Sequence, residues 1–411
     1  MNAIESITYE QDRSASISNE HLSLVSSTLP ALLAELAENA AQRDRDRTLP
    51  YDEIRRLTSL GFAAARVPAE YGGNDIDILE QAKLFIQLAQ ADPNIAQALQ
   101  PHACGLEKIR IYGTPTQRAH YFSLVLQGAI ITNASAERGS AIVGDIKVRL
   151  SRDDDAWTLN GDKHYCTGSL YASHFYILAL RDDGQRSIAL VPRDRPGVEV
   201  LDDWNGMGQR TTASGTVRLR QVSVAENELL LLPAAGTVRT YEGAYAQLLH
   251  AAIDCGIALA AFADATEYGR NRARPVPEAG VSRSSDDPYV QQAVGEMAAL
   301  AHGAQAMVER AAAVLQAVVP DALSHRADET RLSNASIAVA EAKMAATHAS
   351  LRVSEMLYQV GGASATTRIW NFDRHWRNAR THTTHDPVAY KAKAVGNYYL
   401  NGTLPPINTK I

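Results

Sequence analysis

The stretch GMGQRTTASGTVRLRQVSV, residues 206–224, shows which secondary structure occupies the middle of the chain. Apolar and polar residues alternate in TVRLR and again in QVSV. A period of two is typical of a strand with one buried face. The same alternation occurs in residues 146–168 and 175–194. We therefore predict a small, mostly antiparallel β-domain over residues 128–237.

Two dipeptides inside this region are typical of hairpin turns. Asn160-Gly161 and Asp183-Gly184 each combine a residue that tolerates a left-handed backbone with a glycine. We expect a turn between two strands at both places.

The segments on either side of the β-domain have the period of a helix. In ALLAELAENAAQRDRDR, residues 31–47, apolar residues recur at i, i+3 and i+4. After residue 238 the amphipathic segments are long and rich in alanine, as in helical bundles. The fold class is therefore predicted to be α+β, with an N-terminal helical domain over 1–127 and a C-terminal helical bundle over 238–411.

Composition narrows the class of protein. The chain has 411 residues, a formal net charge of -6 and 45% hydrophobic residues, which gives no support to nucleic-acid binding. Its three cysteines form no CxxC pair, so neither a disulfide framework nor a zinc ribbon is indicated. No apolar run approaches the ~18 residues of a membrane span, and the first residues lack a secretory pattern. We expect a cytoplasmic protein without a membrane segment.

Several strings resemble the acyl-CoA dehydrogenase superfamily along nearly the whole chain. Besides residues 206–224, they are VPAEYGG (67–73), NASAERGS (133–140), LNGDKHYCTG (159–168) and EYGRNRARP (267–275). The resemblance implies an N-terminal helical domain, a middle β-barrel-like domain and a C-terminal four-helix bundle. It also implies a flavin at the subunit boundary of a homotetramer.

The resemblance breaks at the catalytic base. Members of this superfamily that dehydrogenate a thioester carry a glutamate after an arginine-rich turn, and here that place reads RTHTTHDPVAYK, residues 380–391. No glutamate occurs between Arg380 and Ile411, and the alternative position near Ala246 is not acidic. The base of a dehydrogenase is therefore missing.

The stretch that stands in place of the glutamate, together with several other strings, resembles the flavin-dependent monooxygenases built on this fold. These include dibenzothiophene monooxygenase and the sulfur-acquisition oxidoreductases. The strings that carry it are QRDRDR (42–47), DDWNGMGQRTTASGTV (202–217), LHAAIDCGIA (249–258), HWRNARTHTTHDP (375–387) and AVGNYYLNG (394–402).

That resemblance implies a two-component enzyme. Reduced FMN would come from a separate NAD(P)H-dependent flavin reductase, and O2 would be the other co-substrate. No GxGxxG follows a strand, so no nicotinamide site is expected in this chain. The implied substrate is a small organosulfur compound, an alkanesulfinate such as methanesulfinate or a sulfone. The alternatives are an amine N-hydroxylase, an acyl-CoA dehydrogenase with a displaced base, and a flavin-binding protein without catalysis.

His382 and His385 are three residues apart, and three interpretations of this pair are possible. A zinc site would need a further ligand that the sequence does not offer, so no metal is expected. Packed structural histidines are the second interpretation. We favour the third, in which they are catalytic and donate hydrogen bonds to a reacting oxygen beside the flavin ring.

Three further side chains are expected beside the flavin. Asn133 and Thr167 are short polar groups that the resemblance places at the ring, with capping of strand ends as the alternative. Trp204 would lie flat on the ring, or else would be an ordinary core tryptophan. Asn133 and Thr167 are also assigned to catalysis with the two histidines.

The substrate pocket and the phosphate site complete the prediction. Gln97 and His102 are expected to line the pocket. Arg274 is expected to bind the FMN phosphate, because a guanidinium forks onto phosphate oxygens. Ser364 stands where the relatives have a second phosphate-binding arginine, and its hydroxyl can still bind the phosphate.

Overall fold

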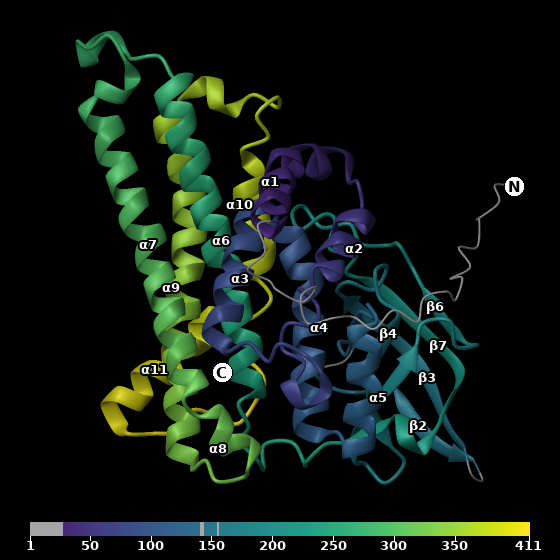
Figure 1. Ribbon diagram of the computed structural model, residues 1–411. Coiled ribbons are helices and arrows are strands. Elements are labelled where there is room, and N and C mark those ends of the chain that lie inside the picture. Colours follow the sequence, from purple (N-terminus) through teal and green to yellow (C-terminus); the bar gives the residue numbers. More distant parts are fainter. Residues whose placement is uncertain (1–27, 140–143, 154–155) are drawn as a thin grey trace, which may run out of the picture.

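The structure is a computed structural model that describes residues 28–139, 144–153 and 156–411 (Figure 1). Residues 1–27, at the head of the first predicted domain, lie outside the described residues. So does Ser140, the last residue of NASAERGS.

Helices make up the N-terminal third of the chain, and polar caps define where they begin. Asp77, Asp92 and Thr114 each accept a backbone N–H of the helix that follows, and proline occupies the first turn of the last two. The helices are α1 (Thr28–Asp46), α2 (Tyr51–Ser59), α3 (Ile78–Ala91), α4 (Pro93–Tyr112) and α5 (Pro115–Leu126), with a short 3-10 turn η2 (Ala69–Tyr71). Nearly all of α4 is buried, so it is the central helix of this part.

The middle of the chain forms one mixed sheet. Its strands are β1 (Ile131–Ala134), β2 (Arg149–Asp153), β3 (Ala156–Cys166), β4 (His174–Arg181), β5 (Arg186–Pro192), β6 (Val198–Val200), β7 (Gly215–Val224) and β8 (Leu229–Leu231), with η3 (Glu226–Glu228) before the last. Their order is β6-β7-β3-β2-β4-β5-β8, and β1 pairs with β4. The pairings β1–β4 and β2–β4 are parallel, and the other pairings among the described strands are antiparallel.

One of the two predicted hairpins is confirmed and the other is wrong. Asp183-Gly184 forms the turn between β4 and β5, which pair antiparallel. Asn160-Gly161 lies inside β3 instead, where the register against β7 shifts between Leu159 and Gly161. Gly161 has φ +136, and a Cβ there would lie 2.6 Å from Val148. Its glycine therefore serves a β-bulge and a close packing contact, for which the same dipeptide is suited.

The C-terminal part is a bundle built on three long helices. They are α6 (Glu242–Asn271), α7 (Pro288–Gln316) and α9 (Glu329–Gly361), accompanied by α8 (Val319–Leu323), α10 (Asp373–Thr383), α11 (Val388–Asn401) and the turns η4 (Pro277–Ala279), η5 (Ser284–Asp286) and η6 (Ala363–Thr366). Figure 1 shows α3 and α4 between this bundle and the sheet. Within the described chain, α6 has the length and apolarity of a membrane span, but 83% of that window is buried in the protein. It is therefore a core helix of the bundle.

Residues 206–224 connect the sheet to the helical bundle. The backbone N–H of Gln209 donates to Oδ1 of Asn378 in α10, at 2.7 Å. A Cβ on Gly208 would lie 2.0 Å from the carbonyl oxygen of Arg377, so only glycine permits this approach. The loop before β7 thus sets how the β-domain meets α10, the helix that ends at the histidine pair.

Both predicted domain boundaries fall between elements. The division at 127/128 lies between α5 and β1, and the division at 237/238 lies between β8 and α6. Whether the three parts behave as separate folding units stays a prediction.

Candidate active site

Three helices meet at His382, which is buried at the end of α10. Its Nδ1 hydrogen-bonds Oδ1 of Asp254 in α6. Its Nε2 is 3.0 Å from Oε1 of Gln97 in α4 and 3.0 Å from Nδ1 of His250 in α6. The structure therefore brings together two predicted site residues, His382 and Gln97, and adds two that were not predicted.

His385 lies on the other side of His250. The two rings have centroids 4.3 Å apart and planes inclined by 35°. The side chain of His385 is 49% exposed, whereas that of His382 is 2% exposed. Nδ1 of His385 is 2.8 Å from Oδ1 of the buried Asp386. The imidazoles of His385, His250 and His382 thus run from an accessible position into the interior, and we call these three residues the histidine row.

Each carboxylate of this region is paired with a lysine. Oδ2 of Asp254 accepts from Nζ of Lys343 and, at 3.1 Å, from the hydroxyl of Thr347. Oδ2 of Asp386 is 3.2 Å from Nζ of Lys391. The two pairs cancel in charge, and their members are nearly wholly buried. Neither carboxylate is therefore free to act as the base of a displaced dehydrogenase site.

Burial sets the charge state of the two inner members of the row, His382 and His250. It lowers the pKa of His382, although the nearby Asp254 carboxylate opposes this. The pKa of His250 is lowered well below its usual value by burial and by the adjacent His385 and His382. Burial alone would raise the pKa of Asp254, but Lys343 and His382 outweigh it and the net shift is downward. At neutral pH, two neutral imidazoles therefore lie beside an ionised carboxylate.

Asn133, near the end of β1, and Thr167, directly after β3, carry polar atoms suited to a flavin ring. The hydroxyl of Thr167 is 2.9 Å from that of Ser214, which is 2.8 Å from that of Thr212. Oδ1 of Asn133 is buried and has no hydrogen-bond partner among the described residues. Because buried acceptors are normally satisfied, this orphaned oxygen fits an N–H group of a bound flavin.

A close contact relates these strand ends to the histidine row. Gly168 follows Thr167 and has φ +79, and a Cβ there would lie 2.6 Å from the carbonyl oxygen of Ala98. Ala98 is the neighbour of Gln97, which reaches His382. Thr167 and His382 therefore approach the same turn of α4 from the sheet and from the bundle.

Trp204 is half-buried beside this region. Its indole N–H donates to the carbonyl of Gln209 at 2.7 Å, and its ring meets the edge of Tyr165 at 6.4 Å between centroids. The contact with a flavin stays a prediction.

Both ring nitrogens of His102 form hydrogen bonds with the backbone. Its Nε2–H donates to the carbonyl of Ala63 at 2.8 Å, and its Nδ1 accepts the N–H of Ile131 at 3.0 Å. Burial lowers its pKa to about 4. The ring thereby joins α4 to the start of the sheet, so any contact with a substrate in the predicted pocket would have to use its ring carbons.

Arg274 and Ser364 are both exposed and lie at the far end of α6. Arg274 and Gly362 line a cavity of about 440 Å³ between the segment after α6, the start of α7 and the end of α9, and Ser364 follows two residues later. At 1.5 Å per residue, the 21 residues from His250 to Asn271 span roughly 30 Å. One chain therefore does not bring Arg274 and the histidine row to the same FMN molecule.

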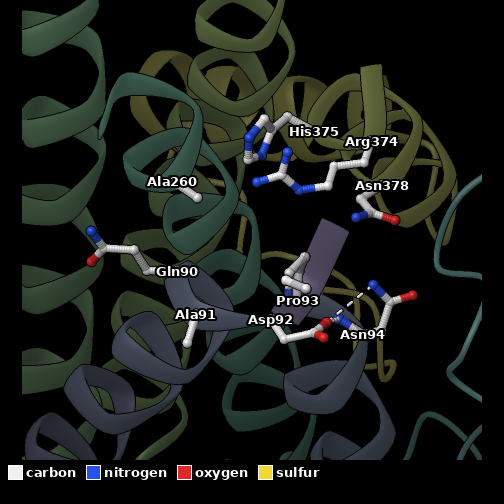
Figure 2. A pocket seen from close by; sticks show the side chains of 10 residues that line it. Gln90, Ala91, Asp92, Pro93, Asn94, Ala260, Arg374, His375 and Asn378 are labelled. Atoms are coloured by element: carbon white, nitrogen blue, oxygen red, sulfur yellow. Dashed lines mark hydrogen bonds between the residues drawn. The ribbon is translucent and has the colours of Figure 1, made fainter. Parts of the chain in front are cut away.

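A second cavity lies between α1, the end of α3, the start of α4, α6 and α10 (Figure 2). It measures about 20 Å³ and is bordered by Asp92, Asn94 and Arg374, among others. This is room for about one water molecule, so the cavity is not a substrate or flavin site.

The three comparisons with known proteins agree on the family. Models of the acyl-CoA dehydrogenase family match the chain in order, with the N-terminal domain at residues 18–129, the middle domain at 132–222 and the C-terminal domain at 248–389. The chain belongs to the acyl-CoA dehydrogenase family. The predicted α+β fold class and its three-part architecture are thereby confirmed.

Its relatives within the family include several monooxygenases. A dibenzothiophene monooxygenase of Rhodococcus erythropolis is 34% identical over 89% of this chain and 90% of that protein. A probable FMNH2-dependent monooxygenase, SfnC of Pseudomonas putida, is 31% identical over 91% and 94%. The structure of methanesulfinate monooxygenase MsuC from Pseudomonas fluorescens superposes with a TM-score of 0.87 at 30% identity, covering 94% of this chain and all of that one. The predicted resemblance to this branch of the family is confirmed.

Sequence reasoning missed much of the site of this family member. His250 and Asp254 are four residues apart in LHAAIDCGIA, a spacing that places both on one face of a helix. That spacing was a usable signal. Asp386 and Lys391 both stand in RTHTTHDPVAYK, but their pairing was not recognised, and Lys343 had no local signal. In the described part of the chain, no group of three or more His, Cys, Asp or Glu is arranged to hold a metal ion.

Proposed function

We propose that this protein is the oxygenase component of a two-component monooxygenase that oxygenates a small organosulfur compound. The substrate class we favour is an alkanesulfinate such as methanesulfinate, with a sulfone as the other member. Support comes from the relatives, because they include a methanesulfinate monooxygenase and a dibenzothiophene monooxygenase. Reduced FMN would be supplied by a separate NAD(P)H-dependent flavin reductase.

The enzyme class and the cofactor have firmer support than the substrate. The prediction of an FMN-dependent monooxygenase is confirmed by the homologous FMNH2-dependent enzyme. When bound, reduced FMN supplies two of the four electrons that reduce O2, and the substrate sulfur supplies the other two. For a sulfinate the overall reaction balances as RSO2⁻ + O2 + FMNH2 → RSO3⁻ + FMN + H2O. One oxygen atom forms the new S–O bond, and the other takes two protons and leaves as water.

The observation that carries the proposal is the histidine row where a dehydrogenase needs a free glutamate. Both nearby carboxylates are paired with lysines, so neither is a free carboxylate that could remove a proton from a thioester. Imidazoles can instead donate and accept protons around a reacting oxygen. His385, as the accessible member, would contact the reacting atoms, while the buried His382 and His250 would exchange protons behind it.

The sheet side of the site would hold the flavin ring. The orphaned Oδ1 of Asn133 would accept an N–H of the ring, and the hydroxyl of Thr167 would approach it from the next strand. Trp204 would cover the ring. Fixed donors and acceptors in a site closed to water act more strongly than they would in solution.

The position of Arg274, the predicted phosphate ligand, implies a second copy of the chain. Because Arg274 lies roughly 30 Å along α6 from the row, it would bind the phosphate of an FMN whose ring lies in a neighbouring subunit. Exposed apolar residues on α11 suit such an assembly, for instance Tyr399 and Leu400, which are 65% and 84% exposed. We propose a homotetramer, and light scattering at micromolar concentration tests this. A monomer would contradict it.

Product analysis under ¹⁸O2 tests the function. The enzyme with reduced FMN is mixed with methanesulfinate, dimethyl sulfone or an amino sugar, and the mass of each product is measured by mass spectrometry. One ¹⁸O atom in the sulfonate is the expected result. Labelled hydroxylamine would favour the N-hydroxylase instead, and anaerobic bleaching of oxidised flavin by an acyl-CoA would favour the dehydrogenase.

A further inference from the structure

The two nitrogens of His382 meet chemically different partners. Nδ1 faces the Asp254 carboxylate, on which Lys343 and Thr347 also converge. An ionised carboxylate can only accept hydrogen bonds, so the proton of this contact belongs to Nδ1. The pairing with Lys343 keeps the buried carboxylate ionised, so this assignment holds in both charge states of His382.

Nε2 of His382 is therefore the nitrogen that gains or loses a proton. With Nδ1 protonated, a neutral His382 has a lone pair at Nε2, and Nδ1 of His250 must donate to it across 3.0 Å. If His382 takes up a second proton, Nε2 becomes a donor. The amide of Gln97 suits both states, because rotating it by 180° exchanges its NH2 group and its oxygen.

We propose that Asp254 is a positioning residue that acts through His382. It fixes His382 with the proton on Nδ1, so that Nε2 is the atom at which the histidine row accepts and returns a proton. What that proton is used for rests on the proposed monooxygenase function, but the assignment itself does not.

The surroundings favour His382 over His250 as the place where an extra proton resides. His382 hydrogen-bonds a carboxylate directly, whereas Asp386 acts on His250 only through space. The groups facing His382 are Asp254 and His250 from α6, Lys343 from α9, Gln97 from α4, and His385 beyond the end of α10. Burial, Lys343 and His385 oppose a charge on His382, and the Asp254 carboxylate is the nearest group that offsets them. Between the two buried imidazoles, an extra proton therefore resides on His382 rather than on His250.

The same two helices contain a matched arrangement away from the row. Asp264 lies ten residues after Asp254 in α6, and Nε2 of His375 in α10 is 2.7 Å from its Oδ2. Arg374 supplies the cation, at 2.7 Å. This contact has the chemistry of the Asp254 site but adjoins only the water-sized cavity of Figure 2. The Asp264 side chain is 33% exposed, so this site serves as a control for the loss of a partly buried Asp–His contact.

Neutron diffraction from deuterated crystals of the FMN-bound enzyme tests the proton assignment directly. We expect a deuteron on Nδ1 of His382 at every pH examined, with occupancy at Nε2 rising as the pH is lowered. A bare Nδ1 would overturn the proposal. This result does not depend on knowing the substrate.

Paired substitutions test the positioning role, since they avoid leaving an unpaired buried charge. Asp254→Leu with Lys343→Met removes the acceptor, and we expect the product formed per O2 consumed to fall by about tenfold or more, as when an orienting partner is lost. Asp254→Asn with Lys343→Met is isosteric and still accepts from Nδ1, so it should retain most of the coupling. Asp264→Leu with Arg374→Met should retain the wild-type value.

Three outcomes would count against the proposal. They are wild-type coupling in the Leu/Met variant, equal loss in the Leu/Met and Asn/Met variants, and equal loss in the Asp264 control. If wild-type enzyme oxygenates no organosulfur compound while the neutron map shows the proton on Nδ1, the proposed function fails and the assignment stands.

Discussion

The rings of His250 and His385 lie against each other, with centroids 4.3 Å apart, so that a buried imidazole backs an accessible one. His385 lies just beyond α10, where its N–H still bonds to the carbonyl of His382 at 3.1 Å. Pro387 then prevents the helix from continuing before α11 begins. The break in the helix is what leaves the His385 side chain half exposed at the mouth of the row.

His385→Ala should separate oxygen consumption from product formation. The variant should fold and bind FMN, because it removes an exposed ring and no core element. Coupled product formation should fall by ~10²-fold, the scale for a positioned catalytic group, and hydrogen peroxide release should rise. Oxygen uptake, peroxide and product are measured together, with His120→Ala, an exposed histidine on α5, as the control. Unchanged coupling would leave His385 a structural residue.

Lys343→Met alone should destabilise the protein. It leaves the Asp254 carboxylate buried without its cation, which costs about 3–5 kcal/mol in comparable sites. The urea midpoint for unfolding should drop accordingly, and Asp254→Asn added to the same chain should restore much of it. A single variant as stable as wild type would show that the ion pair contributes little to the fold.

Acid should weaken the fold through His102. Burial lowers its folded pKa to about 4, whereas an unfolded histidine titrates near 6.5. Its contribution is complete above ~6.5 and is lost as the pH falls towards 4, because the unfolded chain then binds a proton that the folded chain does not. The loss should reach roughly 3 kcal/mol. Urea unfolding at several pH values measures it, and His102→Gln should flatten the dependence in this window. An equal slope in the variant would contradict this.

Arg274→Ala should weaken the binding of reduced FMN by about 1.5–3 kcal/mol, the range for a hydrogen bond to a charged group. Anaerobic equilibrium titration measures it, and Arg270→Ala, an exposed charge one turn earlier, is the matched control. Equal loss in both would indicate a general electrostatic effect. Reduced FAD binding tenfold more tightly than reduced FMN, about 1.4 kcal/mol, would contradict the predicted cofactor.

Local pattern was sufficient to predict the fold. The change from a period of 3.6 to a period of two, and back, marked the sheet between two sets of helices. Specific strings added the family, the missing glutamate and the histidine pair. The dipeptide Asn160-Gly161 misled, because a left-handed backbone and the absence of a Cβ are required by a β-bulge as much as by a turn.

The site was predictable only in part. Gln97 and His382 were both named, but their mutual contact follows from how α4 and α10 pack, with 285 residues of chain between them. His102 was expected to line a pocket, but in the folded chain both of its ring nitrogens form hydrogen bonds with the backbone.

The sequence by itself determined the order of helices and strands, the family and the residue types at the candidate site, because these depend on local periodicity, on shared strings and on side-chain chemistry. The tertiary structure alone decided which of these groups are hydrogen-bond partners. Asp254 is 128 residues from His382 and 89 from Lys343, and only the packing of α6 against α9 and α10 makes them partners. A proton's position depends on burial and on the nearest charge, and both are properties of the folded chain.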